Sequence, residues 1–218
     1  SEGTDYALYQ SKSGANPWFE IKQDGASMTI ADNTTMSLPD LTQLTIECVM
    51  YLDALPSAAG YYGILWLEGQ RQPGDPDYSP GAGWTGEREA GMWLYNATGH
   101  LQGGTRRDGG WAFTNPNYNE SIAPTGTPFH VMFVMTENVF VMGWGNTNLH
   151  EIYVNGVKVA ETWMAYSTSN RTVNGLTKAY FGGSPTRITP KCFVRDVRIS
   201  NIARDASYGL AAAAALTT

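Results

Sequence analysis

Residues 150–161, HEIYVNGVKVAE, constrain the fold more than any other segment, because they describe a tight β-hairpin. Polar and apolar residues alternate up to Val154, the pair Asn155-Gly156 interrupts the pattern, and alternation resumes from Val157. A two-residue type I′ turn needs positive φ at both central positions, which Asn and Gly adopt most readily. The sequence therefore predicts two antiparallel strands joined at Asn155-Gly156.

Further apolar runs predict an all-β chain, with strands in residues 41–53, 60–69, 90–104, 129–146, 177–184 and 191–201. In the first run, alternation places one set of side chains on a single face, namely Leu44, Ile46, Cys48, Met50 and Leu52. Residues 129–146 are apolar at nearly every position, which is typical of strands covered on both faces, and Thr136-Glu137-Asn138 is expected to be a turn between them. In the last run, alternation assigns Phe193, Arg195, Val197 and Ile199 to one face.

Composition favours many short strands joined by turns, because the chain has 24 Gly and 11 Pro but only 16% charged residues. A chain of 218 residues, 42% of them hydrophobic, is long enough for one β-sandwich. We expect a single domain, residues 1–218, with a core of about 28–206 and a tail of 207–218. A helix is predicted only in RDASYGLAAAAALTT, residues 204–218, and so short a helix must dock on the sandwich or on a neighbouring molecule.

Charge and hydropathy limit the classes of partner. The net charge of −6 and the sequence pI near 5.0 leave no phosphate-neutralising surface, so we expect no nucleic-acid partner. No stretch reaches the roughly 18 apolar residues that cross a bilayer, so we expect no membrane insertion. Residues 1–10 lack the basic start and apolar middle of a signal peptide, and Ser1 is expected to follow either a removed signal peptide or only an initiator Met.

The two cysteines, Cys48 and Cys192, lie in strand patterns far apart in the sequence. If their strands were neighbours, a disulfide would close a long loop and stabilise the fold by about 4–5 kcal/mol in the chain-entropy model. The alternative is a pair of buried free thiols, since Cys behaves as a small hydrophobe. Both interpretations stand on the sequence alone, and neither Cys has the CxxC spacing of a metal or redox site.

Two long connections, residues 69–86 and 104–122, are the candidate contact regions, because loops of that length in compact domains are often functional. Their aromatic and charged residues could stack on sugar rings or anchor a protein interface. The candidates are Tyr78, Trp84, Arg106, Arg107, Asp108, Trp111 and Tyr118. The alternative is that these rings fold inward and order the loops.

Five segments in series, LTQLTIECVMYLD, HVMFVM, HEIYVNGVKVA, AYFGGSP and FVRDVRISNIARD, resemble the laminin-G-like and concanavalin-A-like jelly-roll superfamily. The resemblance covers roughly residues 28–206 and lies in the order of the elements more than in any one motif. The chain departs from the family pattern at Arg195-Asp196, where Asp-Glu is usual, and in its long loops after Glu68 and Gly103.

The resemblance implies two antiparallel sheets packed face to face, with ligands of many relatives on a concave face or its rim loops. It also implies a rim Ca²⁺ that Asp75 and Asp77, or Asp108, could ligate. Asp beside Pro and Gly is foremost a turn former, so calcium is not predicted and no other cofactor is expected. The fold hosts lectins, adhesion modules, glycosidases, lyases and virion proteins, so it does not settle function.

Enzymatic signatures are weak in this sequence. Glu87 and Glu89 share a face of a strand, as in glucan-hydrolysing relatives, but the third acid of that motif is missing. Arg88, His130 and Tyr180 follow the order of alginate-lyase relatives without the accompanying Gln and Lys. His100, His130 and His150 have no metal-ligand spacing.

We therefore interpret the chain as a non-enzymatic jelly-roll module, displayed outside a cell or on a virion surface, that binds carbohydrate or mediates adhesion. The first alternative is a structural virion surface protein, such as a phage capsid decoration or fibre component, that contacts neighbouring subunits and forms homo-oligomers or particles. The second is a polysaccharide lyase or glycosidase.

Overall fold

The computed structural model describes residues 5–7, 18–21, 28–32, 42–56, 60–70, 87–95, 98–107, 110–116, 121–143, 145–165, 176–181 and 192–215. Within them the chain forms two antiparallel sheets and one short helix, which confirms the predicted β-sandwich. None of the helices in these residues is long and apolar enough to cross a membrane.

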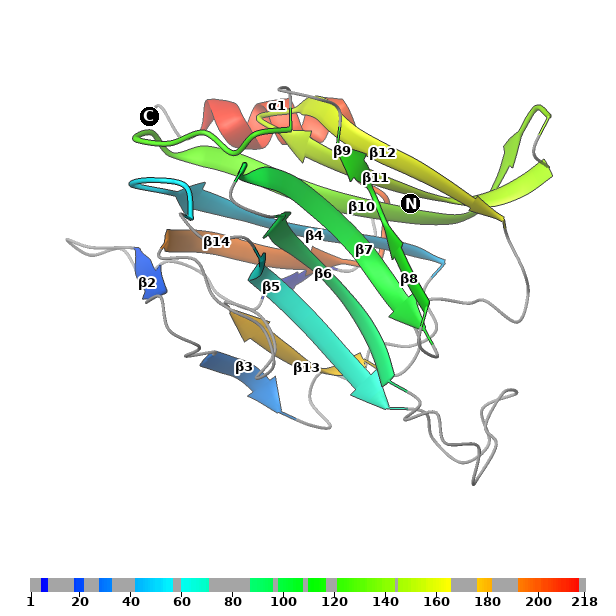
Figure 1. The fold of residues 1–218 in the computed structure, drawn as a ribbon, viewed down its shortest axis with the longest axis horizontal. Helices are drawn as coiled ribbons and strands as arrows, with labels where there is room; N and C mark the ends of the chain where they lie inside the picture. The colour runs from blue at the N-terminus through cyan, green and yellow to red at the C-terminus, as the bar shows by residue number, and fades with distance from the viewer. Residues whose placement is uncertain are drawn as a thin grey trace.

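An eight-stranded and a six-stranded sheet make up the sandwich (Figure 1). The eight-stranded sheet has the order β1 (Asp5–Ala7), β14 (Cys192–Ser200), β4 (Gln43–Tyr51), β10 (Phe129–Val141), β11 (Gly145–Val154), β12 (Val157–Ala165) and β9 (Asn115–Pro116), and β2 (Phe19–Ile21) also pairs with β14. The six-stranded sheet has the order β3 (Met28–Asp32), β13 (Leu176–Phe181), β5 (Tyr61–Gln70), β6 (Glu87–Tyr95), β7 (His100–Arg107) and β8 (Gly110–Phe113). Strands from both ends of the chain thus meet in the larger sheet.

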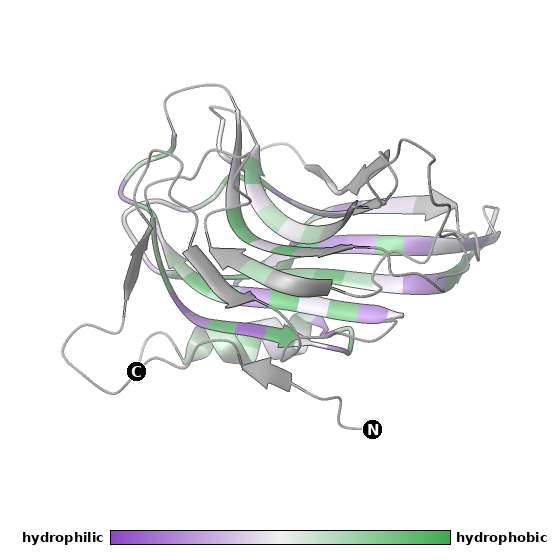
Figure 2. Cartoon of the chain, turned by 90° about the horizontal axis from the view of Figure 1, so that it is seen from below, coloured by the Kyte–Doolittle hydropathy of each residue, from purple (hydrophilic) through white to green (hydrophobic). Residues whose placement is uncertain are grey.

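The centre of the larger sheet is covered on both faces. On β4, Ile46, Cys48 and Met50 belong to the core between the sheets, whereas Glu47 and Val49 are buried on the opposite, outer face. Figure 2 shows hydrophobic and hydrophilic residues alternating along the strands. The helix α1 (Ala206–Ala214) packs on β10, β11 and β12 and covers part of this outer face.

The predicted Asn155-Gly156 hairpin is confirmed, because it joins β11 and β12 with φ values of 49° and 78°. The turn is tied to the neighbouring strand: the Asn155 backbone N–H donates to the His130 carbonyl at 2.9 Å, and the His130 N–H donates to Asn155 Oδ1 at 2.8 Å. The predicted helix is confirmed as well. Its N-terminus is capped by Asp205, whose carboxylate accepts from the Tyr208 N–H at 3.0 Å.

The turn expected at Thr136-Glu137-Asn138 is wrong. Strand β10 continues through these residues to Val141, and the extra residue is absorbed by a β-bulge at which Asn138 adopts a φ of 60°. The prediction of one long connection over residues 104–122 is wrong too, because β7 extends to Arg107 and β8 and β9 follow. The polar residues of this segment favour a loop on sequence alone, but edge strands such as β8 and β9 accommodate polar residues.

The single face assigned to Phe193, Arg195, Val197 and Ile199 is wrong because of a second bulge. The register of β14 against β4 shifts between Arg195 and Arg198, and Asp196 takes a φ of 51°. Val197 and Ile199 therefore join the core, whereas Arg195 and Arg198 remain partly exposed. The bulge inverts the alternation along this strand.

Cys48 and Cys192 are free thiols in the structure, and both are buried in the main core. Their strands are neighbours, but Phe193 pairs with Tyr51, so the two cysteines are not cross-strand partners. Burial raises the pKa of Cys192 to about 12, so this thiol is kept protonated.

The bulge at Asp196 can be tested by substitution. Replacing Asp196 by Val should destabilise the fold by about 1–2 kcal/mol more than replacing it by Gly, because only Gly accepts positive φ without steric cost. Both variants lose the carboxylate, so their difference in urea-unfolding free energy isolates the backbone. Equal stabilities would contradict the left-handed conformation.

A buried histidine should make stability depend on pH. His150 has no exposed surface, and burial lowers its pKa to about 4. Between pH 6.5 and 4 the unfolded chain binds this proton and the native fold does not, so acidification destabilises the fold by about 3 kcal/mol in total. Urea titrations at pH 7 and pH 4.5 should show this loss, and His150→Gln should reduce it. An identical pH dependence in that variant would contradict the prediction.

Candidate functional site

An aromatic hollow opens on the outer face of the larger sheet, at the end of β4. It has a volume of about 320 Å³ and is lined by Trp18, Tyr51, Pro128 and Phe193. Tyr51 and Phe193 are paired across β4 and β14, with ring centroids 6.1 Å apart, and Trp18 meets Tyr51 edge-on at 6.4 Å. The three rings are only partly buried. They therefore present apolar surface that a ligand can cover.

A polar pocket of about 410 Å³ adjoins the hollow. It is lined by Glu47, Val49, His130, Arg195, Asp196, Arg198, Tyr208, Ala211, Ala212 and Ala215. Arg195 connects the two depressions, because it lines the polar pocket while its guanidinium carbon lies 4.7 Å from the centre of the Trp18 ring. We call the hollow and the polar pocket together the outer groove.

The bulge at Asp196 determines which charges face the outer groove. Without the extra residue, Arg195 and Arg198 would lie on opposite faces of β14, because their separation is odd. With it, both are directed outward, beside Glu47 on the neighbouring strand. Arg195 Nε lies 3.4 Å from Asp196 Oδ2, and Arg198 Nη1 lies 3.8 Å from Glu47 Oε1. Two arginines thus stand opposite two carboxylates.

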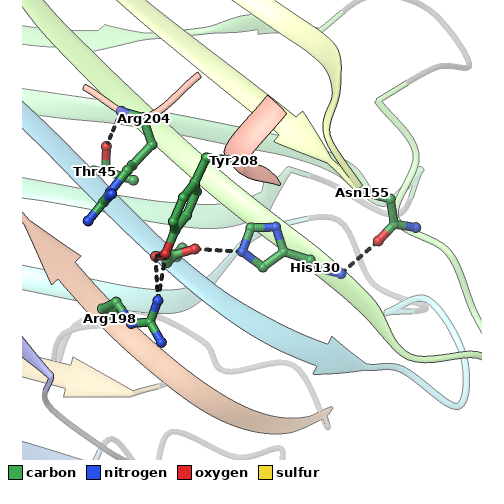
Figure 3. Close-up of polar contacts among 7 residues, drawn as sticks. Thr45, His130, Asn155, Arg198, Arg204 and Tyr208 are labelled. Atoms are coloured by element: carbon green, nitrogen blue, oxygen red, sulfur yellow. Dashed lines mark hydrogen bonds and ion pairs between the residues drawn. The ribbon is translucent and has the colours of Figure 1, made fainter. Parts of the chain in front are cut away.

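Glu47 is the centre of a hydrogen-bond network at the base of the polar pocket. Figure 3 shows the other members of the network, His130, Tyr208 and Arg198. Glu47 Oε2 lies 2.7 Å from His130 Nε2, and its Oε1 accepts from the Tyr208 hydroxyl at 2.7 Å. Arg198 Nη1 in turn donates to the Tyr208 oxygen at 2.6 Å. Burial first, and then the bond to Glu47, raises the pKa of Tyr208, so the phenol stays protonated and donates. The network joins β4, β10, β14 and α1.

The helix reaches this position through a close approach of two glycines. A Cβ on Gly156 would lie 2.5 Å from the Leu210 backbone nitrogen, and one on Gly209 would lie 3.1 Å from the Gly156 Cα. The segment before the helix is held by Thr45, whose hydroxyl donates to the Ile202 carbonyl at 2.6 Å and accepts from the Arg204 N–H at 3.0 Å. The Asn155-Gly156 hairpin is therefore also the seat of α1.

The acid–base candidates of the outer groove, His130 and Glu47, are buried. His130 and Glu47 are each only 3% exposed, and they are hydrogen-bonded to each other. A general acid or base must reach a proton of the substrate, and these two groups lie beneath Tyr208 at the floor of the pocket. No group of three or more His, Cys, Asp or Glu that could hold a metal ion occurs in the described part of the chain.

The lyase arrangement of Arg88, His130 and Tyr180 is not assembled. Arg88 and Tyr180 lie on β6 and β13 of the six-stranded sheet, whereas His130 lies on β10 of the other sheet and faces Glu47 on its outer side. The core separates the two sets. The pair Glu87 and Glu89 also belongs to β6, where Glu89 pairs with Glu68.

The contact candidates of the two long connections are placed only in part. Arg106, Arg107 and Trp111 lie on β7 and β8 at the edge of the six-stranded sheet, where Arg106 pairs with Trp111. The remaining candidates, Tyr78, Trp84, Asp108 and Tyr118, and the calcium candidates, Asp75 and Asp77, lie outside the described residues.

The aromatic hollow is not among the sites predicted from the sequence. Trp18, Tyr51 and Phe193 come from three distant segments, and only Tyr51 and Phe193 lie in predicted strands. The one available signal was the position of Tyr51, which falls on the polar face of an otherwise clear alternation. A large ring on that face indicates either a covering element or a binding surface.

Comparison with known proteins supports the fold alone. No family model matches the sequence, and no curated protein matches it. The structure is similar to the binding domain of botulinum neurotoxin serotype C1, with a TM-score of 0.61 and 13% identity over 99% of this chain and 47% of that chain. It is also similar to the binding domain of botulinum neurotoxin DC solved with SialylT, with a TM-score of 0.60 and 12% identity over 99% of this chain and 46% of that one.

The chain thus spans less than half the length of these neighbours. At 12–13% identity the likeness shows a shared β-sandwich. Membership of the laminin-G-like or concanavalin-A-like superfamily stays a prediction.

The glycine seat of α1 gives a matched test. Ala at Gly156 should destabilise the fold by about 1–3 kcal/mol more than Ala at Gly126, because only the former would collide with the helix backbone. The φ values, 78° and 74°, impose similar backbone strain. Urea unfolding measures the difference, and faster proteolysis of the C-terminal segment should accompany it. Equal losses in the two variants would show that the helix does not rest on Gly156.

Proposed function

We propose that this protein is a non-catalytic carbohydrate-binding module that holds a sugar in the aromatic hollow of the outer groove. The observation that carries the proposal is the open cluster of Trp18, Tyr51 and Phe193, with Arg195 stacked on one side and polar groups next to it. Sugars present apolar C–H faces together with hydroxyl groups, so aromatic rings beside hydrogen-bonding residues suit them. A volume of about 320 Å³ is enough for a small ligand.

The charges of the outer groove favour a neutral glycan. Arg195 and Arg198 are each within 4 Å of a carboxylate, from Asp196 and Glu47 respectively. Neither guanidinium is therefore a free positive charge that would attract a carboxylate or sulfate group. The overall charge of −6 opposes an acidic polysaccharide further.

A displayed location, outside a cell or on a virion surface, goes with this function as part of the proposal. In the structural-subunit alternative, the loops and the C-terminal tail contact neighbouring subunits. In the structure α1 instead packs on its own sheet, and Gly209 is buried against the hairpin. The enzyme alternatives lack an accessible acid–base pair in the outer groove. The carbohydrate-binding role therefore has the most support.

Replacing a ring of the hollow should abolish much of the sugar affinity without unfolding the protein. Trp18→Ala and Phe193→Ala are each expected to weaken binding of a neutral oligosaccharide about tenfold, which corresponds to about 1.4 kcal/mol. A glycan array identifies the ligand, and titration calorimetry measures the loss. Phe140→Ala removes an exposed ring elsewhere, since Phe140 is 73% exposed, and should bind as the wild type does.

The melting temperature of each variant separates lost contact from lost fold. Wild-type protein that binds no glycan on the array, or a Trp18→Ala variant with unchanged affinity, would refute the proposal. A large drop in the melting temperature of Phe193→Ala would show that this ring supports the fold. The sugar affinity of Trp18→Ala would then test the proposal.

A further inference from the structure

The hairpin formed by the ends of β10 and β11 extends beyond the rest of the larger sheet. Among the described residues, β4 pairs with β10 only as far as Thr136, and β12 pairs with β11 only as far as Thr147. Past these points, Phe140 pairs with Asn146 and Val141 with Gly145, so the hairpin continues as a two-stranded ribbon. Figure 1 shows this ribbon curving away from the sandwich. We call residues 138–143 and 145–147 the hairpin tip.

The hairpin tip carries apolar side chains in water. Met142 is 91% exposed and Phe140 is 73% exposed, the two highest values among the exposed large hydrophobic residues of the described chain. Phe140 lies next to the end of β10 and Met142 follows in the turn, so both belong to the far end of the ribbon. An isolated two-stranded ribbon gains little stability, so these residues do not serve the core.

No described residue of the hairpin tip is charged. Asn138, Asn146 and Thr147 supply its polar groups, and the nearest acidic residue, Glu137, is buried with 6% exposure. The tip therefore has no Lys or Arg to attract an anionic surface, and the net charge of −6 repels one. We therefore expect a partner that has no net charge and offers an apolar environment to the two side chains.

Size distinguishes a bilayer from a protein partner. A stable protein interface buries about 800 Å² on each side, which two side chains on a narrow ribbon do not provide. The boundary between lipid headgroups and acyl chains accepts a small apolar projection without shape complementarity. Such an insertion differs from a membrane-spanning segment, because it needs only a few exposed residues.

We propose that the hairpin tip inserts Phe140 and Met142 into the headgroup region of an electrically neutral, zwitterionic lipid bilayer. The glycan site is independent of this contact. Pro128, in the aromatic hollow, immediately precedes β10, whereas the hairpin tip lies at its other end. One surface therefore does not require the other.

The test is co-sedimentation of the protein with phosphatidylcholine vesicles. The wild type should bind, and the double variant Phe140→Ser/Met142→Ser should partition at least about tenfold less. A double variant that makes two other exposed apolar residues polar, Val157→Thr/Leu210→Ser, controls for general hydrophobicity, since these are 64% and 61% exposed. It should bind as the wild type does, and so should Trp18→Ala.

Adding phosphatidylserine to the vesicles should weaken binding and not strengthen it. The proposal is overturned if the wild type does not bind phosphatidylcholine, if the tip variant binds equally well, or if the control variant loses as much. Light scattering tests the alternative that the tip contacts a second copy of the chain. If the wild type forms an oligomer, the tip variant does not, and neither binds vesicles, the tip is a contact between copies and the bilayer proposal is refuted.

Discussion

The outer face of the larger sheet is organised around one buried carboxylate. Glu47 is 3% exposed, and a carboxylate removed from water is costly unless its oxygens accept strong hydrogen bonds. The two bonds come from His130 on β10 and from Tyr208 on α1, and Arg198 on β14 completes the network. Satisfying this one group therefore fixes the position of the helix over the sheet and the orientation of the arginine beside it.

Local irregularities, more than regular strands, make the outer groove. The bulge at Asp196 turns Arg195 and Arg198 to the same face, and the positive-φ turn at Asn155-Gly156 leaves space for the helix. Both sites use residues that accept left-handed backbone more readily than most. The regular part of β4 and β14 then supplies the cross-strand pair of Tyr51 and Phe193. Groove and fold are thus specified by the same few positions.

Local patterns allowed the strands, the Asn155-Gly156 hairpin and the terminal helix to be predicted, because each signal lies within a short stretch of sequence. The bulges at Asn138 and Asp196 could not be predicted, since a period of two does not reveal where one extra residue is absorbed. The hollow was missed for a different reason. Trp18, Tyr51 and Phe193 meet only through strand pairing between distant segments, and spacing carries no information about that.

The length of β10 sets the distance between the proposed glycan site and the proposed bilayer contact. The strand has 13 residues and so spans about 40 Å from the aromatic hollow to the hairpin tip. A ligand at the hollow and a bilayer at the tip would therefore lie at opposite ends of the larger sheet. The two proposed contacts would therefore be made by separate surfaces, and neither would obstruct the other.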